Sequence, residues 1–210
     1  MEKTHAKEVK IDKRSLKTKK AIKKALKKLM CSTDISKITI KEIAIEADIN
    51  RKTFYTHYTD VFSVLKEIED DLTSKLINIL NTYEISEKKY NPYPIFAELT
   101  DVINKDIEFY NLLLSYSRFS NLINKITFVL KEYIYNYCTA RANINNTSLP
   151  YVVNFISAGV ISSYQEWLNS EKKITLEELS ETLSVLIAGG INSIVSTYNI
   201  LAIIFLLIIV

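Results

Sequence analysis

The chain has 210 residues, of which 48% are hydrophobic, and it carries 27 Lys and Arg against 24 Asp and Glu, a formal net charge of +3. This apolar content is sufficient for a buried core and excludes a wholly disordered chain. Only three Gly and three Pro are present, whereas turn-rich β-sandwiches and glycine-loop nucleotide folds require many of both. The composition therefore predicts an all-α protein.

The positive charge is concentrated near the N-terminus. Residues 1–60 contain 16 Lys and Arg and 8 Asp and Glu, a net charge of +8, whereas residues 61–210 contain 11 and 16, a net charge of −5. Nine of the basic residues lie between Lys13 and Lys28, with no acidic residue among them. Such an asymmetry is expected when one module of a protein binds a polyanion and the other does not.

The basic run also contains an apolar stripe. A solvated helix face would explain the lysines alone, but apolar residues recur among them at spacings of three and four, which predicts an amphipathic helix. The stripe consists of Ala21, Ile22, Ala25, Leu26, Leu29 and Met30. A basic amphipathic helix could instead lie on an anionic membrane, and the segment that follows it decides against this alternative.

Residues 36–60 have the pattern of a helix-turn-helix. Thr39 and Glu42 have the spacing of a capping box at the start of a short helix. Asp48 follows this helix, and Asp tolerates the left-handed conformation that a tight turn requires. Asn50 can then cap a second helix over residues 51–58. Two short helices joined in this way place the second one in the major groove of DNA.

The second helix carries polar side chains beside an apolar anchor. Phe54 and Tyr58 are four residues apart and can hold one face of the helix against the rest of the domain. The other side chains can bind phosphates or base edges; they are Arg51, Lys52, Thr53, Tyr55 and His57. Two ordinary surface helices remain the alternative interpretation.

The residues from Ile38 to Ala44 and from Ala47 to Tyr58 resemble the DNA-binding domain of TetR-family transcriptional regulators, and the resemblance spans about residues 14–72. It implies an all-helical homodimer in which helices 1–3 bind DNA, helices 4–7 surround an effector pocket, and the last two helices form a four-helix bundle. Two positions depart from the family pattern. Asp48 replaces the usual Gly of the turn, and Val61 replaces a frequent Lys, which removes an expected phosphate contact.

The resemblance and the polar pattern together define a predicted DNA-binding set. We expect the lysines of the first helix, Lys17 among them, and Thr39 to hold phosphates, with Lys41 beside them. Base edges are assigned to Arg51, Lys52 and Thr53, and the positioning of the second helix on the DNA backbone to Tyr55 and His57.

The remainder of the chain also predicts helices. Asp60 can cap a long helix that extends to Tyr83, and we expect one side of it to be acidic because of Glu67, Glu69, Asp70 and Asp71. The clearest break is residues 84–94, where Pro94 can begin the next helix. Further helices are predicted to about Asn104, over 106–116 and 119–141, from Pro150 to Leu168, and from Thr175, where a second capping box occurs.

The last two predicted helices are too apolar for the surface of a monomer. The segments Phe109–Leu113, Tyr164–Leu168 and Ala188–Gly190 also resemble the C-terminal domain common in TetR regulators of low-GC Gram-positive bacteria. A two-fold dimer that binds a palindromic operator is therefore expected. The predicted dimer interface comprises Val153, Ile156, Val160, Tyr164, Leu183, Ile187, Gly190, Ile191 and Ile194.

An effector pocket is predicted from aromatic residues of the same region. Aromatic side chains at helical spacing also occur as ordinary core residues, and this alternative stays open for each of them. Arg118 could meet an anionic ligand, or it could be a surface or helix-capping residue. The candidate pocket residues are Phe109, Tyr110, Tyr116, Arg118, Tyr133, Tyr137 and Trp167.

Catalytic and metal-binding patterns are not found in the sequence. The two cysteines, Cys31 and Cys138, lie far apart, which favours a reduced, cytoplasmic chain without a metal site. No apolar stretch follows the charges of the N-terminus, so no secretion signal is expected. The only histidines are His5 and His57, and neither a glycine-rich phosphate loop nor a nucleophile elbow is present. We therefore expect no enzyme and no cofactor, although carboxylates on helix faces leave a catalytic pair possible.

The last ten residues, 201–210, are all apolar, and no charged residue follows Glu181. Ten residues are too few to cross a bilayer. The tail could extend the last helix or pack on the dimer, contact a membrane, or form a poorly ordered, aggregation-prone end.

The sequence thus predicts four segments and about nine helices. They are an N-terminal basic arm (1–12), a three-helix DNA-binding domain (13–60), a helical effector-binding and dimerisation domain (61–200) and the apolar tail (201–210). The predicted function is that of a homodimeric repressor that binds operator DNA and responds to an effector. The alternative is a co-activator whose body binds a protein partner instead of a small molecule.

Overall fold

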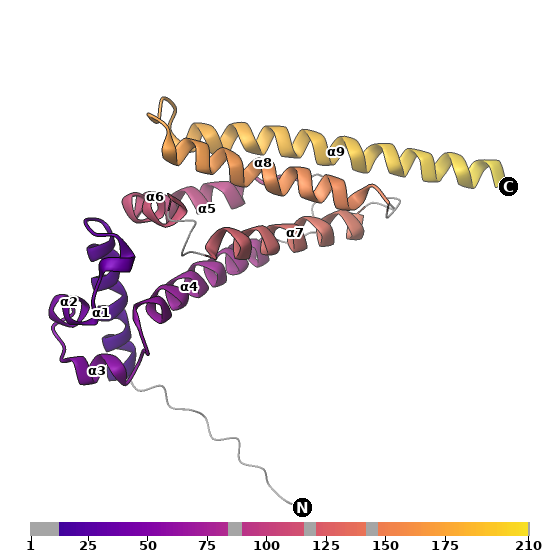
Figure 1. Ribbon diagram of the computed structural model, residues 1–210. Coiled ribbons are helices and arrows are strands. Elements are labelled where there is room, and N and C mark those ends of the chain that lie inside the picture. The colour runs from indigo at the N-terminus through magenta and orange to yellow at the C-terminus, as the bar shows by residue number, and fades with distance from the viewer. Residues whose placement is uncertain (1–12, 84–89, 116–120, 142–146, 210) are drawn as a thin grey trace, which may run out of the picture. The chain divides into compact units, whose positions relative to one another are not determined.

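The computed structural model describes residues 13–83, 90–115, 121–141 and 147–209 (Figure 1). Within these ranges the regular structure consists of nine α-helices and one 3-10 helix, with no strand, which confirms the predicted all-α class. The chain forms two compact units, one ending at Ile68 and the other beginning at Glu69. The predicted N-terminal arm lies outside the described residues.

The N-terminal unit contains α1 (Lys13–Met30), the 3-10 helix η1 (Ile35–Lys37), α2 (Ile40–Glu46), α3 (Arg51–Tyr55) and the first two turns of α4 (Val61–Thr82). Helix α1 buries its apolar stripe in the core of the unit, because lysines occupy the other sides of the helix. The core of the unit is completed by side chains from each of the other elements, namely Ile35, Ile43, Phe54, Tyr58, Val64 and Leu65.

Two lysines of α1 hold α4 by ion pairs. Glu67 Oε2 lies 2.8 Å from Lys19 Nζ, and Glu67 Oε1 lies 3.2 Å from Lys23 Nζ. Partial burial opposes ionisation of Glu67, but the hydrogen bonds from both lysines outweigh it and hold the pKa of this carboxyl below its usual value. The prediction that Glu67 lies on an acidic outer side of α4 is therefore wrong, because this residue faces α1.

The C-terminal unit consists of the rest of α4 together with five helices (Figure 1). They are α5 (Tyr93–Asn104), α6 (Ile107–Ser115), α7 (Leu122–Arg141), α8 (Leu149–Asn169) and α9 (Leu176–Ile209). Pro94 and Pro150 lie in the first turns of α5 and α8, where a missing amide hydrogen costs nothing. Helix α7 packs on α8, and α5 packs on α9.

A buried carboxylate joins α4 to the beginning of α7. Glu69, whose side chain is 5% exposed, accepts a hydrogen bond from the Asn121 backbone amide at 2.9 Å. It also forms an ion pair with Lys125 Nζ at 2.9 Å. Lys125 also contacts Asp70 at 2.8 Å. The prediction that Glu69 faces solvent is thus also wrong. Its partners, Asn121 and Lys125, lie more than fifty residues later in the chain.

Helix α9 is tied to the unit by polar contacts as well as apolar ones. Ser180 Oγ lies 2.6 Å from Thr100 Oγ1 of α5 and 3.1 Å from the Tyr164 hydroxyl of α8, and these groups are buried. Further along, the Asn192 side-chain amide accepts a hydrogen bond from the Tyr90 backbone N–H and donates one to its carbonyl. These contacts set the axial register of α9 against α5 and α8.

Helix α9 continues through the predicted tail to Ile209, so residues 201–209 extend the last helix. None of the helices in the described part of the chain combines the length and apolar content that a bilayer crossing requires. At the other end of α9 the predicted capping box is confirmed, since Glu178 N–H donates to Thr175 Oγ1 at 3.1 Å and Thr175 N–H donates to Glu178 at 2.7 Å.

Candidate nucleic-acid interface and ligand cavity

The turn between α2 and α3 is closed by the two hydrogen bonds of a Schellman motif. Ile49 N–H donates to the Ala44 carbonyl at 2.9 Å, and Asp48 N–H donates to the Ile45 carbonyl at 3.1 Å. Asp48 has φ 53°, the left-handed conformation predicted for it. This position favours Gly, but a short polar side chain is tolerated there. The chain therefore reverses direction between the two helices without the usual glycine.

The two short helices are each capped by their own side chains. At α2, Glu42 N–H donates to Thr39 Oγ1 at 3.3 Å while Glu42 accepts from the Thr39 amide at 2.8 Å and from its hydroxyl at 2.7 Å. At α3, Asn50 Oδ1 accepts from the Thr53 amide at 2.7 Å and from its hydroxyl at 3.0 Å. The two predicted caps are confirmed, and they fix the starting points of both helices.

Helix α3 separates an anchor from an exposed polar surface. Phe54 is fully buried and Tyr58 nearly so, whereas Arg51 and Lys52 are exposed and Tyr55 is 58% exposed. The ring of Phe54 meets those of Tyr55 and Tyr58 at centroid distances of 5.8 Å. Helix α3 thus presents two basic side chains and a phenol to solvent, while its buried Phe54 fixes the helix to the rest of the unit.

The other predicted DNA-binding residues are accessible to different degrees. Lys17, Thr39 and Lys41 are exposed, and Thr53 and His57 are half-buried. Because the hydroxyl of Thr39 donates to Glu42 and that of Thr53 donates to Asn50, both would have to exchange a capping contact for one with DNA. The readily available donors of this set are therefore the lysines, Arg51 and the exposed phenol of Tyr55.

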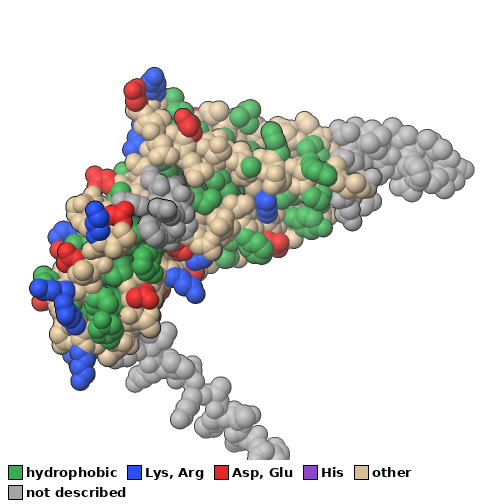
Figure 2. All heavy atoms as spheres, viewed as in Figure 1, with side chains coloured by type: hydrophobic (Ala, Val, Ile, Leu, Met, Phe, Trp, Pro, Cys, Tyr) green, Lys and Arg blue, Asp and Glu red, His purple; other side chains and the backbone are tan. Residues whose placement is uncertain are grey.

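The lysines of α1 divide into two groups. Lys19 and Lys23 pair with Glu67, and Lys28 pairs with Glu46 of α2 at 2.6 Å. Lys19 also lies over the ring of Tyr58, 5.3 Å from its centroid. Four exposed lysines of α1 form no ion pair with the residues that the structure describes, namely Lys13, Lys17, Lys20 and Lys24. Figure 2 shows such blue side chains projecting from the part of the molecule that α1–α3 form.

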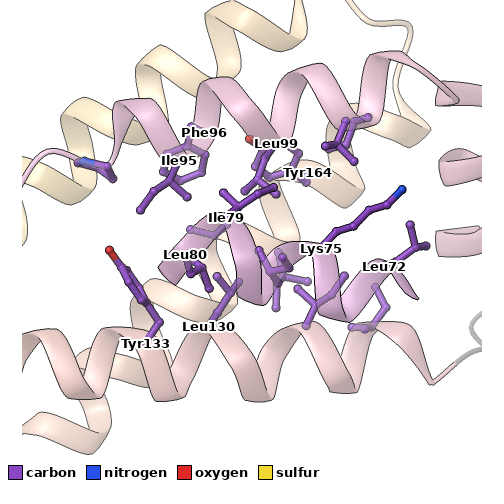
Figure 3. A pocket seen from close by; sticks show the side chains of 18 of the residues that line it. Leu72, Lys75, Ile79, Leu80, Ile95, Phe96, Leu99, Leu130, Tyr133 and Tyr164 are labelled. Carbon is purple, nitrogen blue, oxygen red and sulfur yellow. The ribbon is translucent and has the colours of Figure 1, made fainter. Parts of the chain in front are cut away.

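The C-terminal unit contains a cavity of about 160 Å³ that opens to solvent and is lined mainly by α4, α5, α7 and α8, with one residue each from α6 and α9. Eighteen of its 26 described lining residues are Leu, Ile or Val and five are aromatic, and Lys75 of α4 is the one charged side chain among them. Figure 3 shows Ile79 and Leu80 of α4 facing Leu99 and Ile95 of α5 across this space. A mostly apolar cavity with a few polar groups is the usual form of a small-molecule site.

The structure brings only part of the predicted effector set to this cavity. Tyr110 and Tyr133 line it, whereas Phe109, Tyr137 and Trp167 do not. Phe109 is fully buried in the core, and the indole N–H of Trp167 donates to the Ile174 carbonyl at 2.8 Å. Tyr137 packs on Tyr90 with ring centroids 4.4 Å apart. Tyr116 and the side chain of Arg118 lie outside the described residues.

Several lining residues have no counterpart in the predicted set. Lys75, Tyr90 and Gln165 bring polar groups to the wall. Burial raises the pKa of Tyr90, and its hydroxyl shares a hydrogen bond with that of Tyr133. Burial, with a smaller contribution from Asp106, raises the pKa of Tyr110 to about 12. The phenols are therefore neutral donors at physiological pH.

The predicted dimer residues lie on the inner side of α8 and α9. All of them except Gly190 belong to the core of the unit or pack against it: Val153, Ile156, Val160, Tyr164, Leu183, Ile187, Ile191 and Ile194. The opposite side of the same helices leaves other large apolar side chains in solvent, namely Tyr151 (78% exposed), Phe155 (79%), Val185 (73%) and Leu186 (65%). Gly159, Gly189 and Gly190 lie among them and are also exposed.

We call Tyr151, Phe155, Val185 and Leu186, with the three glycines, the outer apolar face. Green side chains are visible along α8 and α9 in Figure 2. Nothing lies within 4 Å of the place where a Cβ would stand on any of these glycines, so the backbone there is open to close approach. Apolar patches of this kind mark protein–protein contacts. In the part of the chain that the structure describes, no group of three or more metal-ligating side chains occurs.

Comparison with known proteins finds a match to one family model and similarity to several transcriptional regulators. Residues 90–189 match the family model of the transcriptional regulator C-terminal region of TetR type. The chain is 29% identical over 123 residues to the dhaKLM operon transcriptional activator DhaS of Lactococcus lactis, a match that covers 55% of this chain and 64% of that protein. It is 23% identical over 112 residues to the uncharacterised HTH-type transcriptional regulator YxbF of Bacillus subtilis, covering 50% of this chain and 28% of that one.

Solved structures of transcriptional regulators share the fold. The structure of the dihydroxyacetone kinase operon activator DhaS superposes with a TM-score of 0.65 at 19% identity, covering 83% of this chain and 96% of that one. A TetR transcriptional regulator of Streptococcus agalactiae superposes with a TM-score of 0.62 at 22% identity, with the same coverage. The all-helical fold of this chain is thus that of solved transcriptional regulators.

Proposed function

Because the chain belongs to the TetR family of transcriptional regulators, we propose that it binds a palindromic DNA operator as a homodimer, acts as a repressor and is released by an effector. The observation that carries the proposal is the capped helix-turn-helix with Arg51 and Lys52 exposed on the second helix. Phosphate contacts position such a domain on DNA, and side chains of the second helix read base edges.

The charges of the N-terminal unit support DNA as the ligand. The four exposed lysines of α1 without an ion pair to a described residue can neutralise phosphates, while Lys19 and Lys23 hold α4 through Glu67. Neutralised phosphates release counterions, so operator affinity should fall steeply with salt concentration. Val61 stands where a phosphate-binding Lys is frequent, and the basic α1 compensates for its absence.

The outer apolar face supports the proposed homodimer. Pairing α8 and α9 with the same helices of a second copy would cover Tyr151, Phe155, Val185 and Leu186 in a four-helix bundle, with the glycines allowing close backbone contact. A two-fold dimer would in turn present two copies of α3 to the two half-sites of a palindrome. We propose that the protein carries no enzymatic activity and requires no cofactor.

The proposal is tested by substituting Arg51 after selecting bound DNA from a genomic library. Arg51→Ala should weaken binding to the selected operator by about 1–3 kcal/mol, and binding to random DNA by less. Lys105→Ala, an exposed lysine at the end of α5, is the matched control and should bind both DNAs as the parent does. Equal losses on operator and random DNA would remove the base-reading role of Arg51, and failure to select any DNA would overturn the proposal.

The second candidate function is that of an activator controlled by a protein partner. It is favoured by the similarity to DhaS, which is named a transcriptional activator. Affinity capture from a cell lysate and thermal-shift screening against metabolites separate the two control modes. A stoichiometric protein partner without any metabolite effect would support this candidate, and a reporter gene under the selected operator decides between repression and activation.

A further inference from the structure

The cavity of the C-terminal unit is elongated. On α7 its lining extends from Leu122 to Ile134, which corresponds to roughly 18 Å along the helix axis. In Figure 3, Tyr133 and Lys75 lie toward opposite ends of the lining, with the aliphatic side chains between them. A cavity of this form suits a narrow, flexible molecule better than a broad ring system.

The volume limits how much of a ligand can be buried. The cavity holds about 160 Å³, close to the roughly 150 Å³ of an engineered apolar cavity that stays dry and binds benzene. Such a space accommodates about six non-hydrogen atoms. The middle of the cavity is bounded by aliphatic side chains such as Ile79, Leu99 and Leu130, which offer no hydrogen bond to a polar group.

The polar groups of the lining fall into two classes. The Tyr133 hydroxyl is hydrogen-bonded to Tyr90, and the Tyr164 hydroxyl is hydrogen-bonded to Ser180, so these phenols are satisfied without a ligand. Among the described residues, the ammonium of Lys75 has no ion pair or hydrogen bond. Its stem lines the cavity while the residue itself is exposed, so its charge stays at the solvent-facing mouth.

We propose that this cavity binds an unbranched monocarboxylate of about eight carbons, with its tail among the leucines and isoleucines and its carboxylate beside Lys75. Burying a carboxylate would be costly, but here the charged group stays at the mouth and only the chain is desolvated. Charge complementarity selects an anion over a cation, because Lys75 is the one charged group in the described lining. The assignment names the effector class of the proposed regulator and therefore rests on the proposed function.

The direct test is calorimetric titration of the full chain with octanoate, butanoate, 1-octanol and octylamine. Octanoate should bind best. Butanoate should bind on the order of 100-fold more weakly, because four fewer methylenes are buried, and octylamine should not bind measurably. Equal binding of octanoate and 1-octanol, or tighter binding of octylamine, would overturn the assignment of a carboxylate. Absence of octanoate binding to the correctly folded protein would overturn it altogether.

Variants of Lys75 test the position of the carboxylate. Lys75→Met keeps the apolar stem and removes the charge, so octanoate affinity should fall about three- to fivefold while that for 1-octanol is unchanged. Lys75→Arg should restore most of the octanoate affinity. Lys66→Met removes an exposed lysine of the same helix that does not line the cavity, and it should bind octanoate as the parent does. A uniform loss in all three variants would show that the carboxylate does not lie at Lys75.

A DNA-binding measurement separates this inference from the proposed function. Octanoate should lower the affinity of the parent for its selected operator and should do so less for Lys75→Met. If octanoate binds in the calorimeter but leaves operator affinity unchanged, the site stands and the effector role fails. If operator binding is normal and octanoate does not bind, the DNA-binding proposal stands and the ligand class fails.

Discussion

The two units of this protein hold their candidate sites by different means. In the N-terminal unit, the caps of α2 and α3 and the turn between them are made by residues three to five positions apart, and the functional side chains are exposed on top of them. In the C-terminal unit, the cavity is formed by helices far apart in the sequence, and polar contacts of this unit join residues 52, 80 and 102 positions apart. A local site tolerates single changes in neighbouring residues, whereas a cavity depends on the whole packing around it.

Truncating one buried ring in each unit is expected to have the largest effect and to show whether the units unfold separately. Phe54 and Phe109 are both fully buried, so Phe54→Ala and Phe109→Ala should each cost about 3–5 kcal/mol. Denaturant unfolding measures the loss of stability, and hydrogen exchange of the amides in each unit shows which unit has opened. Phe54→Ala should open α1–α3 and abolish DNA binding while the C-terminal amides stay protected. Loss of protection in both units from either variant would show that they form one cooperative unit.

The next prediction compares the two glutamates of α4. Glu69→Ala leaves the Asn121 amide without its acceptor and removes the buried partner of Lys125, which keeps only its pairing with Asp70, and should cost about 2 kcal/mol. Glu67→Ala is the matched control two residues earlier. Its side chain is 29% exposed, so solvent can replace the carboxylate and the loss should be about 1 kcal/mol. Equal losses measured by urea unfolding would mean that the long-range network contributes no more than the partly exposed ion pair.

The same contrast explains what could be predicted from sequence. The caps of α2, α3 and α9 and the left-handed turn at Asp48 follow from short-range rules, because each hydrogen-bonding pair lies within a few residues. The acids of α4 were predicted to face solvent, since nothing near Glu69 in the sequence indicates its partners at Asn121 and Lys125. Only the packing of α7 against α4 brings them together.

Helices α8 and α9 show a second limit of periodicity. Both are apolar on two sides, and the stronger stripe, which contains Val153 and Ile191, is the one buried inside the protomer. The outer side combines a few large residues, such as Phe155 and Val185, with glycines that add little to a periodic signal. A pattern of spacings identifies an apolar stripe but does not say which partner covers it.

A smaller effect is expected at the α2–α3 turn. Asp48 has φ 53°, which costs a residue with a Cβ about 1 kcal/mol relative to Gly. Asp48→Ala should destabilise the N-terminal unit by about 1 kcal/mol, because Ala lacks the short polar side chain that eases this conformation. Asp48→Gly should leave its stability unchanged or raise it by up to about 1 kcal/mol. Thermal unfolding and operator affinity of the two variants provide the measurement, and a stabilising Asp48→Ala would contradict the strain at this position.

The smallest effect is expected from pH, and it should be confined to the N-terminal unit. The hydroxyl and amide of Thr39 both donate to Glu42 and hold the pKa of this carboxyl below its ordinary value of 4.5. A group whose pKa is lower when folded stabilises the fold above its unfolded pKa and loses this contribution as pH falls through the folded pKa. The protection factors of the amides at the start of α2, which correct for the intrinsic pH dependence of exchange, should therefore fall when the pH drops below about 4.5, and Glu42→Gln should remove that dependence. Unchanged protection factors in the parent down to pH 3 would show that the capping box does not depend on the ionised carboxylate.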